Sequence, residues 1–143
     1  MIKDRSSRED WSSGARSVFR RFEIAGRDQG WWDHDGPIVA AVSGGSDSMA
    51  LFWLLCFKWK GRAVAAHLEH GFRKETSLRD AAFVERISRE WNTGCHVEHL
   101  DIPSIKRRGE TLEEAGRRER YAFLERVASS QGASFIATGH TSD

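Results

Sequence analysis

The sequence has 143 residues, of which 39% are apolar and 30% charged, and its formal net charge is +1. This size and composition indicate one soluble globular domain, and the small charge excludes a global field for nucleic acid but not a local basic patch. No apolar run approaches the ~20 residues of a membrane helix, so we expect a cytoplasmic protein that does not enter a membrane. Cys56 and Cys95 form no CxxC pair, which argues against a zinc or iron–sulfur site and indicates reduced core thiols.

The first half of the chain alternates apolar helical and strand patterns. Its first strand is short, apolar and β-branched, as a central parallel strand is, and its second helix is apolar nearly all round, which predicts burial. The predicted order is helix, strand, helix, strand, helix, over about 10–30, 36–43, about 47–60, 62–70 and 78–91. A polar loop is predicted between the last two, over 71–77.

The second half continues the alternation. A third strand is predicted over 95–103, closed by Pro103, and a basic loop follows. Thr111 is the predicted cap of a helix that runs to about Ser130, with Glu114 completing a capping box. A fourth strand is predicted over 134–140. The whole pattern indicates an α/β fold, a doubly wound (Rossmann-like) parallel sheet with helices on both faces.

Ligands of such sheets bind beyond the carboxyl ends of the strands. Three polar clusters follow predicted strands and should gather along that edge: 43–48, 69–73 and 139–143. The first cluster reads Ser-Gly-Gly-Ser-Asp-Ser. Its glycines permit a tight turn and close approach of a ligand. The N–H groups of the loop and of the first helical turn, together with the serine hydroxyls, form a phosphate site.

The loop matches neither the Walker A motif, nor G-x-G-x-x-G, nor the G-x-S-x-G elbow of serine hydrolases. Asp47 would repel a phosphate by itself, so its presence suggests Mg²⁺ between the carboxylate and the phosphates. The competing interpretation is an ordinary tight turn with a helix cap at Ser46 or Asp47. Four polar residues are more than a cap requires, which favours the phosphate site.

S-G-G-x-D-S after a β-branched strand resembles the pyrophosphate loop (PP-loop) of the N-type ATP pyrophosphatases, which have the adenine nucleotide alpha-hydrolase-like fold. Three more segments resemble motifs of the tRNA(Ile)-lysidine synthetases: 67–73, 112–124 and 137–143. Departures from those motifs are Glu69 for Asp, Asn or His, Gly116 for alanine and Thr141 for histidine. The resemblance also implies that 1–143 is the N-terminal part of such a domain, incomplete at its C-terminal end.

The resemblance implies a reaction in which ATP adenylates C2 of the wobble cytidine of tRNA(Ile) and free lysine then displaces AMP to form lysidine. The residues it assigns to ATP and pyrophosphate are Ser43, Gly44, Gly45, Ser46, Asp47 and Ser48. Those it assigns to Mg²⁺ are Asp47 and Asp143, and those to catalysis also include His140, Glu113 and Arg117. Those it assigns to the substrate or tRNA are His70, Arg73 and Arg120.

Simpler interpretations of these residues remain open. Glu113, Arg117 and Arg120 lie on one helix face, which without the resemblance indicates a solvated face with an i, i+4 salt bridge. The basic run 106–110, with the arginines after it, is a candidate RNA contact. His67 is expected to be a buried histidine with its hydrogen bonds satisfied.

Two other functions also remain open. One is a tRNA-thiolating enzyme of the same loop class, against which the missing CxxC cysteines argue. The other is a nucleotide-binding module that is catalytically incomplete. If the fourth strand is a sheet edge, we expect self-association, such as a homodimer, or poor stability, because unpaired strand edges pair with one another.

Overall fold

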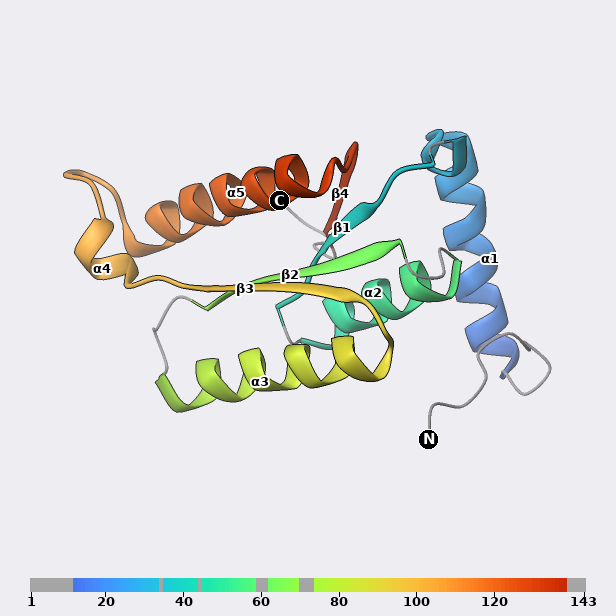
Figure 1. The fold of residues 1–143 in the computed structure, drawn as a ribbon, viewed down its shortest axis with the longest axis horizontal. Coiled ribbons are helices and arrows are strands. Elements are labelled where there is room, and N and C mark those ends of the chain that lie inside the picture. The colour runs from blue at the N-terminus through green and yellow to red at the C-terminus, as the bar shows by residue number, and fades with distance from the viewer. Residues whose placement is uncertain (1–11, 34, 44, 59–61, 70–73, 139–143) are drawn as a thin grey trace.

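The structure is a computed structural model that describes residues 12–33, 35–43, 45–58, 62–69 and 74–138 (Figure 1). Its helices and strands alternate as the sequence predicts. In chain order they are α1 (Ser13–Asp28), the 3₁₀ turn η1 (Trp31–Asp33), β1 (Ile38–Ala41), α2 (Ser46–Lys58), β2 (Ala63–Glu69), α3 (Lys74–Glu90), β3 (Gly94–His99), α4 (Ile102–Ile105), α5 (Leu112–Gln131) and β4 (Phe135–Thr138).

The four strands form one parallel sheet in the order β3-β2-β1-β4. The chain moves outward from β1 through β2 to β3, and then returns to the other side of β1 with β4. The connections reverse direction between β1 and β4, and such a switch point is where doubly wound sheets bind ligands. The α/β prediction is confirmed, and β1 lies at the centre of the described sheet.

The two faces of the sheet carry two apolar clusters, because side chains alternate along each strand. On one face, Phe19 of α1 and Phe52 of α2 pack with Ile38 and Ala40 of β1, and Val84 of α3 joins them. On the other face, α5 packs against the sheet through a separate cluster: Val39, Ala66, Leu68, Phe123, Leu124, Val127 and Ala128. Figure 1 shows α2 and α3 on one side of the sheet and α5 on the other. This confirms helices on both faces.

Helix α1 is fixed to α2 by aromatic packing and one ion pair. Phe19 meets Phe57 edge to face, with ring centroids 5.1 Å apart, and Lys58 pairs with Glu23 at 2.9 Å. Trp32 folds back over α1, where a Cβ at Gly26 would lie only 2.1 Å from its ring. Glycine is therefore required there by space.

Helix α5 has the predicted start and a defined end. Thr111 Oγ1 accepts from the Glu114 N–H, and the Glu114 carboxylate accepts from the Thr111 N–H, which confirms the capping box. At the other end, Gly132 has φ 68° and its N–H donates to the last carbonyls of the helix. This left-handed cap favours glycine.

Two predicted boundaries are wrong. Helix α3 begins at Lys74, inside the segment predicted as a loop, and β3 ends at His99, before Pro103. Pro103 lies instead in the first turn of the short helix α4, a position that needs no backbone N–H donor. Within the described residues, no helix is long and apolar enough to cross a membrane.

Candidate functional site

The candidate phosphate loop, residues 43–48, joins the central strand β1 to α2. The backbone of Ser46 and Asp47 forms the start of α2, whose first N–H groups have no carbonyl four residues earlier in the helix. The positive end of the helix dipole lies at the same place. The sequence therefore folds this loop, as expected, between the carboxyl end of β1 and the first turn of α2.

Serine hydroxyls connect the two ends of the loop. Ser48 Oγ accepts from the Ser43 N–H at 2.9 Å and donates to the Gly45 carbonyl at 3.2 Å. The two hydroxyls of Ser43 and Ser48 are 2.9 Å apart, and the Gly45 N–H donates to Ser43 Oγ at 3.3 Å. Ser48 is 8% exposed, whereas Ser43 is exposed. The Ser48 hydroxyl thus shapes the loop from inside; its predicted contact with a phosphate stays a prediction.

Val42, the residue before the loop, is held by β2. Its N–H donates to the Ala66 carbonyl at 2.9 Å. Its carbonyl accepts from His67 Nδ1 at 2.6 Å. His67 is 4% exposed, and its other ring nitrogen, Nε2, is buried and has no hydrogen-bond partner among the described residues. The prediction that His67 is buried is confirmed; among the described residues, the predicted hydrogen bonding is found at Nδ1 and not at Nε2.

A second pair lies where β2 and β3 end. Glu69 is 8% exposed, and its Oε2 accepts from His99 Nδ1 at 2.9 Å. The Leu100 N–H donates to the Glu69 carbonyl at 2.8 Å, which holds the ends of the two strands together. Sequence reasoning missed His99, although its position at the end of a predicted strand was a usable signal.

Glu113, Arg117 and Arg120 lie on the first half of α5. They precede Leu124 by eleven, seven and four residues, so they continue the helix stripe that packs on the sheet. This half of α5 comes directly after the carboxyl end of β3 and α4, as Figure 1 shows. Glu113 and Arg117 are exposed and Arg120 is partly exposed. The stripe therefore presents charged groups on the part of α5 that comes after the carboxyl end of β3 in the chain.

The expected salt bridge between Glu113 and Arg117 is not among the ion pairs of the described residues. Instead, the guanidinium groups of Arg117 and Arg120 each lie 5.6 Å from the ring centroid of Tyr121. Cations over an aromatic ring are weakly attracted to it, which orders both side chains without neutralising them. Their positive charges stay available for an anionic substrate.

The basic segment before α5 is tied down by one carboxylate. Glu110 pairs with Arg118 at 2.9 Å and also accepts from the Arg107 N–H at 2.7 Å. These bonds, first that of Arg118 and then that of Arg107, lower the pKa of Glu110 from its ordinary 4.5 to about 2. Arg118 also pairs with Glu119. Its charge is thus compensated, and the candidate RNA patch is reduced to the exposed side chains of its neighbours, such as Arg107, Arg108 and Arg117.

Several predicted site residues cannot be placed. His70, Arg73, His140, Asp143 and Gly44 lie outside the described residues, and only the backbone of Ser46 and Asp47 is described. The described residues contain no group of three or more His, Cys, Asp and Glu side chains arranged to hold a metal. The structure brings together Ser43, Gly45, Ser48 and the start of α2, and it places Glu113, Arg117 and Arg120 on one helix stripe.

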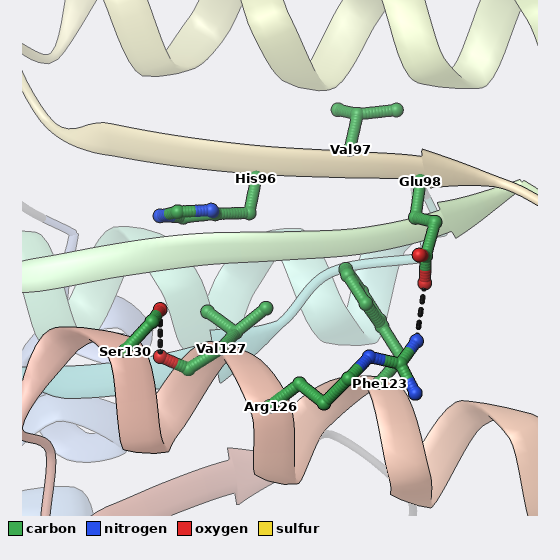
Figure 2. A pocket seen from close by; sticks show the side chains of 7 residues that line it. All are labelled: His96, Val97, Glu98, Phe123, Arg126, Val127 and Ser130. Carbon is green, nitrogen blue, oxygen red and sulfur yellow. Dashed lines mark hydrogen bonds and ion pairs between the residues drawn. The ribbon is translucent and has the colours of Figure 1, made fainter.

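A cavity of about 320 Å³ lies elsewhere, between β3 and α5 (Figure 2). Its polar side chains are already paired: Arg126 with Glu98 at 2.6 Å, and His96 with Gln131 at 2.9 Å. None of the predicted site residues lines it. It is therefore separate from the candidate site.

Comparison with protein-family models gives a match to the PP-loop domain over residues 19–143. The chain belongs to the PP-loop domain family. The match covers the whole sheet and the loop 43–48, so the resemblance stated for that loop is confirmed at the level of the family.

Curated relatives narrow the comparison. The chain is 48% identical to a tRNA(Ile)-lysidine synthase of Thermotoga maritima over 107 residues, which are 72% of this chain and 26% of that protein. A tRNA(Ile)-lysidine synthase of Thermus thermophilus is 48% identical over 109 residues, 75% of this chain and 21% of that protein. The chain thus spans about a quarter of the length of these relatives, so similarity to them concerns this PP-loop segment.

Solved structures agree on the fold. An NH3-dependent NAD synthetase from Campylobacter jejuni superposes with a TM-score of 0.59 at 19% identity, over 90% of this chain and 56% of that one. A U34-tRNA thiolase from Methanococcus maripaludis superposes with a TM-score of 0.56 at 22% identity, over 75% of this chain and 38% of that one. At these identities the likeness concerns the fold alone, which confirms the doubly wound PP-loop architecture.

Proposed function

We propose that this chain carries the nucleotide-binding part of a tRNA(Ile)-lysidine synthetase. The proposed enzyme is a cytoplasmic ligase that forms a C–N bond while ATP is converted to AMP and pyrophosphate. It adenylates C2 of the wobble cytidine of tRNA(Ile), and the amine of free lysine then replaces AMP. One observation carries the proposal: a hydroxyl-linked loop at the switch point of a PP-loop domain whose sequence is 48% identical to lysidine synthases.

The loop is proposed to bind the β- and γ-phosphates, the pyrophosphate that leaves. Backbone N–H groups at the start of α2 and the exposed hydroxyl of Ser43 are the proposed hydrogen-bond donors to these phosphates. Ser48 keeps the loop in shape. Donors fixed before the reaction stabilise the charge that develops on the leaving pyrophosphate, because they need no reorganisation.

Asp47 and Asp143 are the proposed ligands of Mg²⁺. Carboxylate oxygens are the ligands this hard cation prefers, and the backbone of Asp47 lies in the first turn of α2, next to the loop, so the donor chemistry fits the ion. When bound, Mg²⁺ would neutralise charge on the phosphates. His140 is proposed to hydrogen-bond a phosphate or the adenylate.

The first half of α5 is the proposed substrate side. Glu113 is exposed and without an ion pair to a described residue, which suits the ammonium group of lysine. Arg117 and Arg120, ordered on Tyr121, are suited to a phosphate of ATP or of the tRNA. His70 and Arg73 follow β2 in the chain and are proposed to contact nucleotide or RNA.

Titration of the chain with Mg-ATP in a calorimeter tests the nucleotide site. We expect saturable binding by the wild type, and none by Asp47→Ala, because the phosphates and the helix would lose their bridging cation. Asp28→Ala is the matched control, since Asp28 is an exposed aspartate at the end of α1. Unchanged affinity of Asp47→Ala would contradict the metal role. A folded wild type that binds no Mg-ATP would contradict the proposed function of this chain.

Self-association through β4 is a separate proposal. Among the described strands β4 pairs only with β1, and Ile136 on it is 37% exposed. An exposed parallel edge with an apolar side chain favours pairing with a second copy. Gel filtration should therefore show a dimer or larger species, which the edge-breaking variant Ile136→Lys should reduce. A wild type that stays monomeric at high concentration would contradict this proposal.

A further inference from the structure

The peptide unit between Val42 and Ser43 is where the sheet ends and the candidate phosphate loop begins. A peptide unit is planar, so its C=O and N–H turn together. Here both groups are bound by side chains from different elements. The Val42 carbonyl accepts from His67 Nδ1 of β2 at 2.6 Å, and the Ser43 N–H donates to Ser48 Oγ of α2 at 2.9 Å. Two side chains therefore fix the orientation of a single peptide.

The hydrogen bond assigns the donor role to one ring nitrogen. A carbonyl oxygen only accepts, so Nδ1 carries the hydrogen of this bond. The other ring nitrogen, Nε2, is buried and has no hydrogen-bond partner among the described residues. A buried polar atom without a partner is unfavourable for folding, so burial of the ring alone does not account for a histidine at this position. The bond from Nδ1 to the Val42 carbonyl is the contact that an apolar side chain could not make.

We propose that His67 is a positioning residue for the phosphate loop. Its Nδ1–H holds the Val42–Ser43 peptide in the orientation that aims the Ser43 N–H at Ser48. Through that bond, it sets the Ser43 and Ser48 hydroxyls that connect the loop. His67 does not touch the nucleotide in this proposal. Its effect on ATP binding rests on the proposed function, whereas its effect on the loop does not.

Three substitutions distinguish a positioning role of His67 from a contribution to the stability of the fold. His67→Leu removes the donor and also removes the unpartnered Nε2. His67→Asn keeps a donor at the same number of bonds from Cβ as Nδ1. His67→Gln carries the same amide one carbon farther, level with Nε2, and is the matched control for polarity. A positioning role predicts that Asn rescues what Leu and Gln lose.

The first measurement is hydrogen exchange at the Ser43 amide in the free chain, which does not depend on any nucleotide. We expect exchange to be about tenfold faster in His67→Leu and His67→Gln, because the anchored peptide gains freedom when one of its bonds is lost. We expect His67→Asn to stay within about threefold of the wild type. Equal exchange in Asn and Gln variants would overturn the proposal.

The second measurement is affinity for Mg-ATP, with the thermal midpoint recorded alongside. We expect Kd to rise about tenfold in His67→Leu and His67→Gln and to return to the wild-type value in His67→Asn. The thermal midpoints of the three variants should not follow the same order as their Kd values. Affinity that follows the midpoints would show a purely structural histidine. If His67→Leu does not fold, the comparison of His67→Asn with His67→Gln decides between a positioning role and a purely structural one. If the wild type binds no Mg-ATP, the proposed function fails, and the Ser43 exchange rates alone support or overturn the role of His67.

Discussion

The phosphate loop and the start of α5 are both polar, and both follow the carboxyl end of a strand, but they are held in different ways. The loop depends on one side chain from a distant strand, His67 on β2, which holds its entrance, and on its own Ser48 at the start of α2, which holds its interior. The start of α5 is fixed by its own neighbours, through the capping box of Thr111 and Glu114 and the pair Glu110–Arg118.

This difference separates two functional demands. A loop that must place several N–H groups around one polyanion needs tertiary anchors, because its backbone has no regular ladder of its own. A helix needs only a stable start to present Glu113, Arg117 and Arg120 at helical spacing, since its internal bonds do the rest. Loop residues should therefore affect nucleotide affinity, and the residues that fix the start of α5, Glu110 and Thr111, should affect stability alone.

Among changes that remove a hydrogen bond or ion pair in these two regions, the largest effect is expected from Ser48→Ala. The change leaves the Ser43 N–H and the Gly45 carbonyl without the hydroxyl they share, so stability should fall by about 1–2 kcal/mol and Mg-ATP should bind at least about tenfold more weakly. Calorimetric titration and urea unfolding measure the two effects.

Thr111→Ala is the matched control for this change, because it removes a bonded hydroxyl from the other region. It should cost about 1 kcal/mol of stability through the lost cap and leave the affinity for Mg-ATP unchanged. Equal loss of affinity in both variants would mean that the two regions do not differ in the way described.

The smallest effect is expected from Glu110→Gln, and it depends on pH. Because the pKa of Glu110 lies at about 2 when folded and 4.5 ordinarily, its carboxylate stabilises the fold above about pH 4.5, and this contribution is lost as the pH falls toward 2. The thermal unfolding midpoint of the variant should therefore lie below that of the wild type at neutral pH, and the two midpoints should approach each other in acid. Thermal unfolding across this range measures the gap, with Glu125→Gln, a change at an exposed glutamate of α5, as the control. A gap that does not narrow in acid would contradict the role of Glu110.

Local signals in the sequence predicted most of the framework. The capping box at Thr111 and Glu114 is a pattern within four residues, and the first strand is an apolar β-branched run followed by a polar turn. The loop was found because S-G-G-x-D-S follows such a run. The sequence did not reveal the contacts between distant residues, which are those of His67 with Val42 and of Glu69 with His99.

The two boundary predictions were wrong at positions whose residue types are compatible with two kinds of local structure. Pro103 ends a strand as readily as it begins a helix, and only the position of α4 against α5 decides between them. The start of α3 at Lys74 was missed because a polar stretch can be a loop or a first helical turn. Both errors lie at the carboxyl edge of the sheet, where polar residues serve more than one purpose.

The order of the strands also determines when the site takes shape during folding. The pairings of β1 with β2 and of β2 with β3 join neighbouring parts of the chain, whereas Ile38 of β1 pairs with Phe135 of β4, near the other end of the described chain. Closing so long a segment costs more entropy than forming the nearer pairs and tends to come after them. The strand beside the phosphate loop is therefore flanked on both sides only when almost the whole described chain has folded. During synthesis, β4 would have to leave the ribosome before the strand that leads into the loop has both of its neighbours.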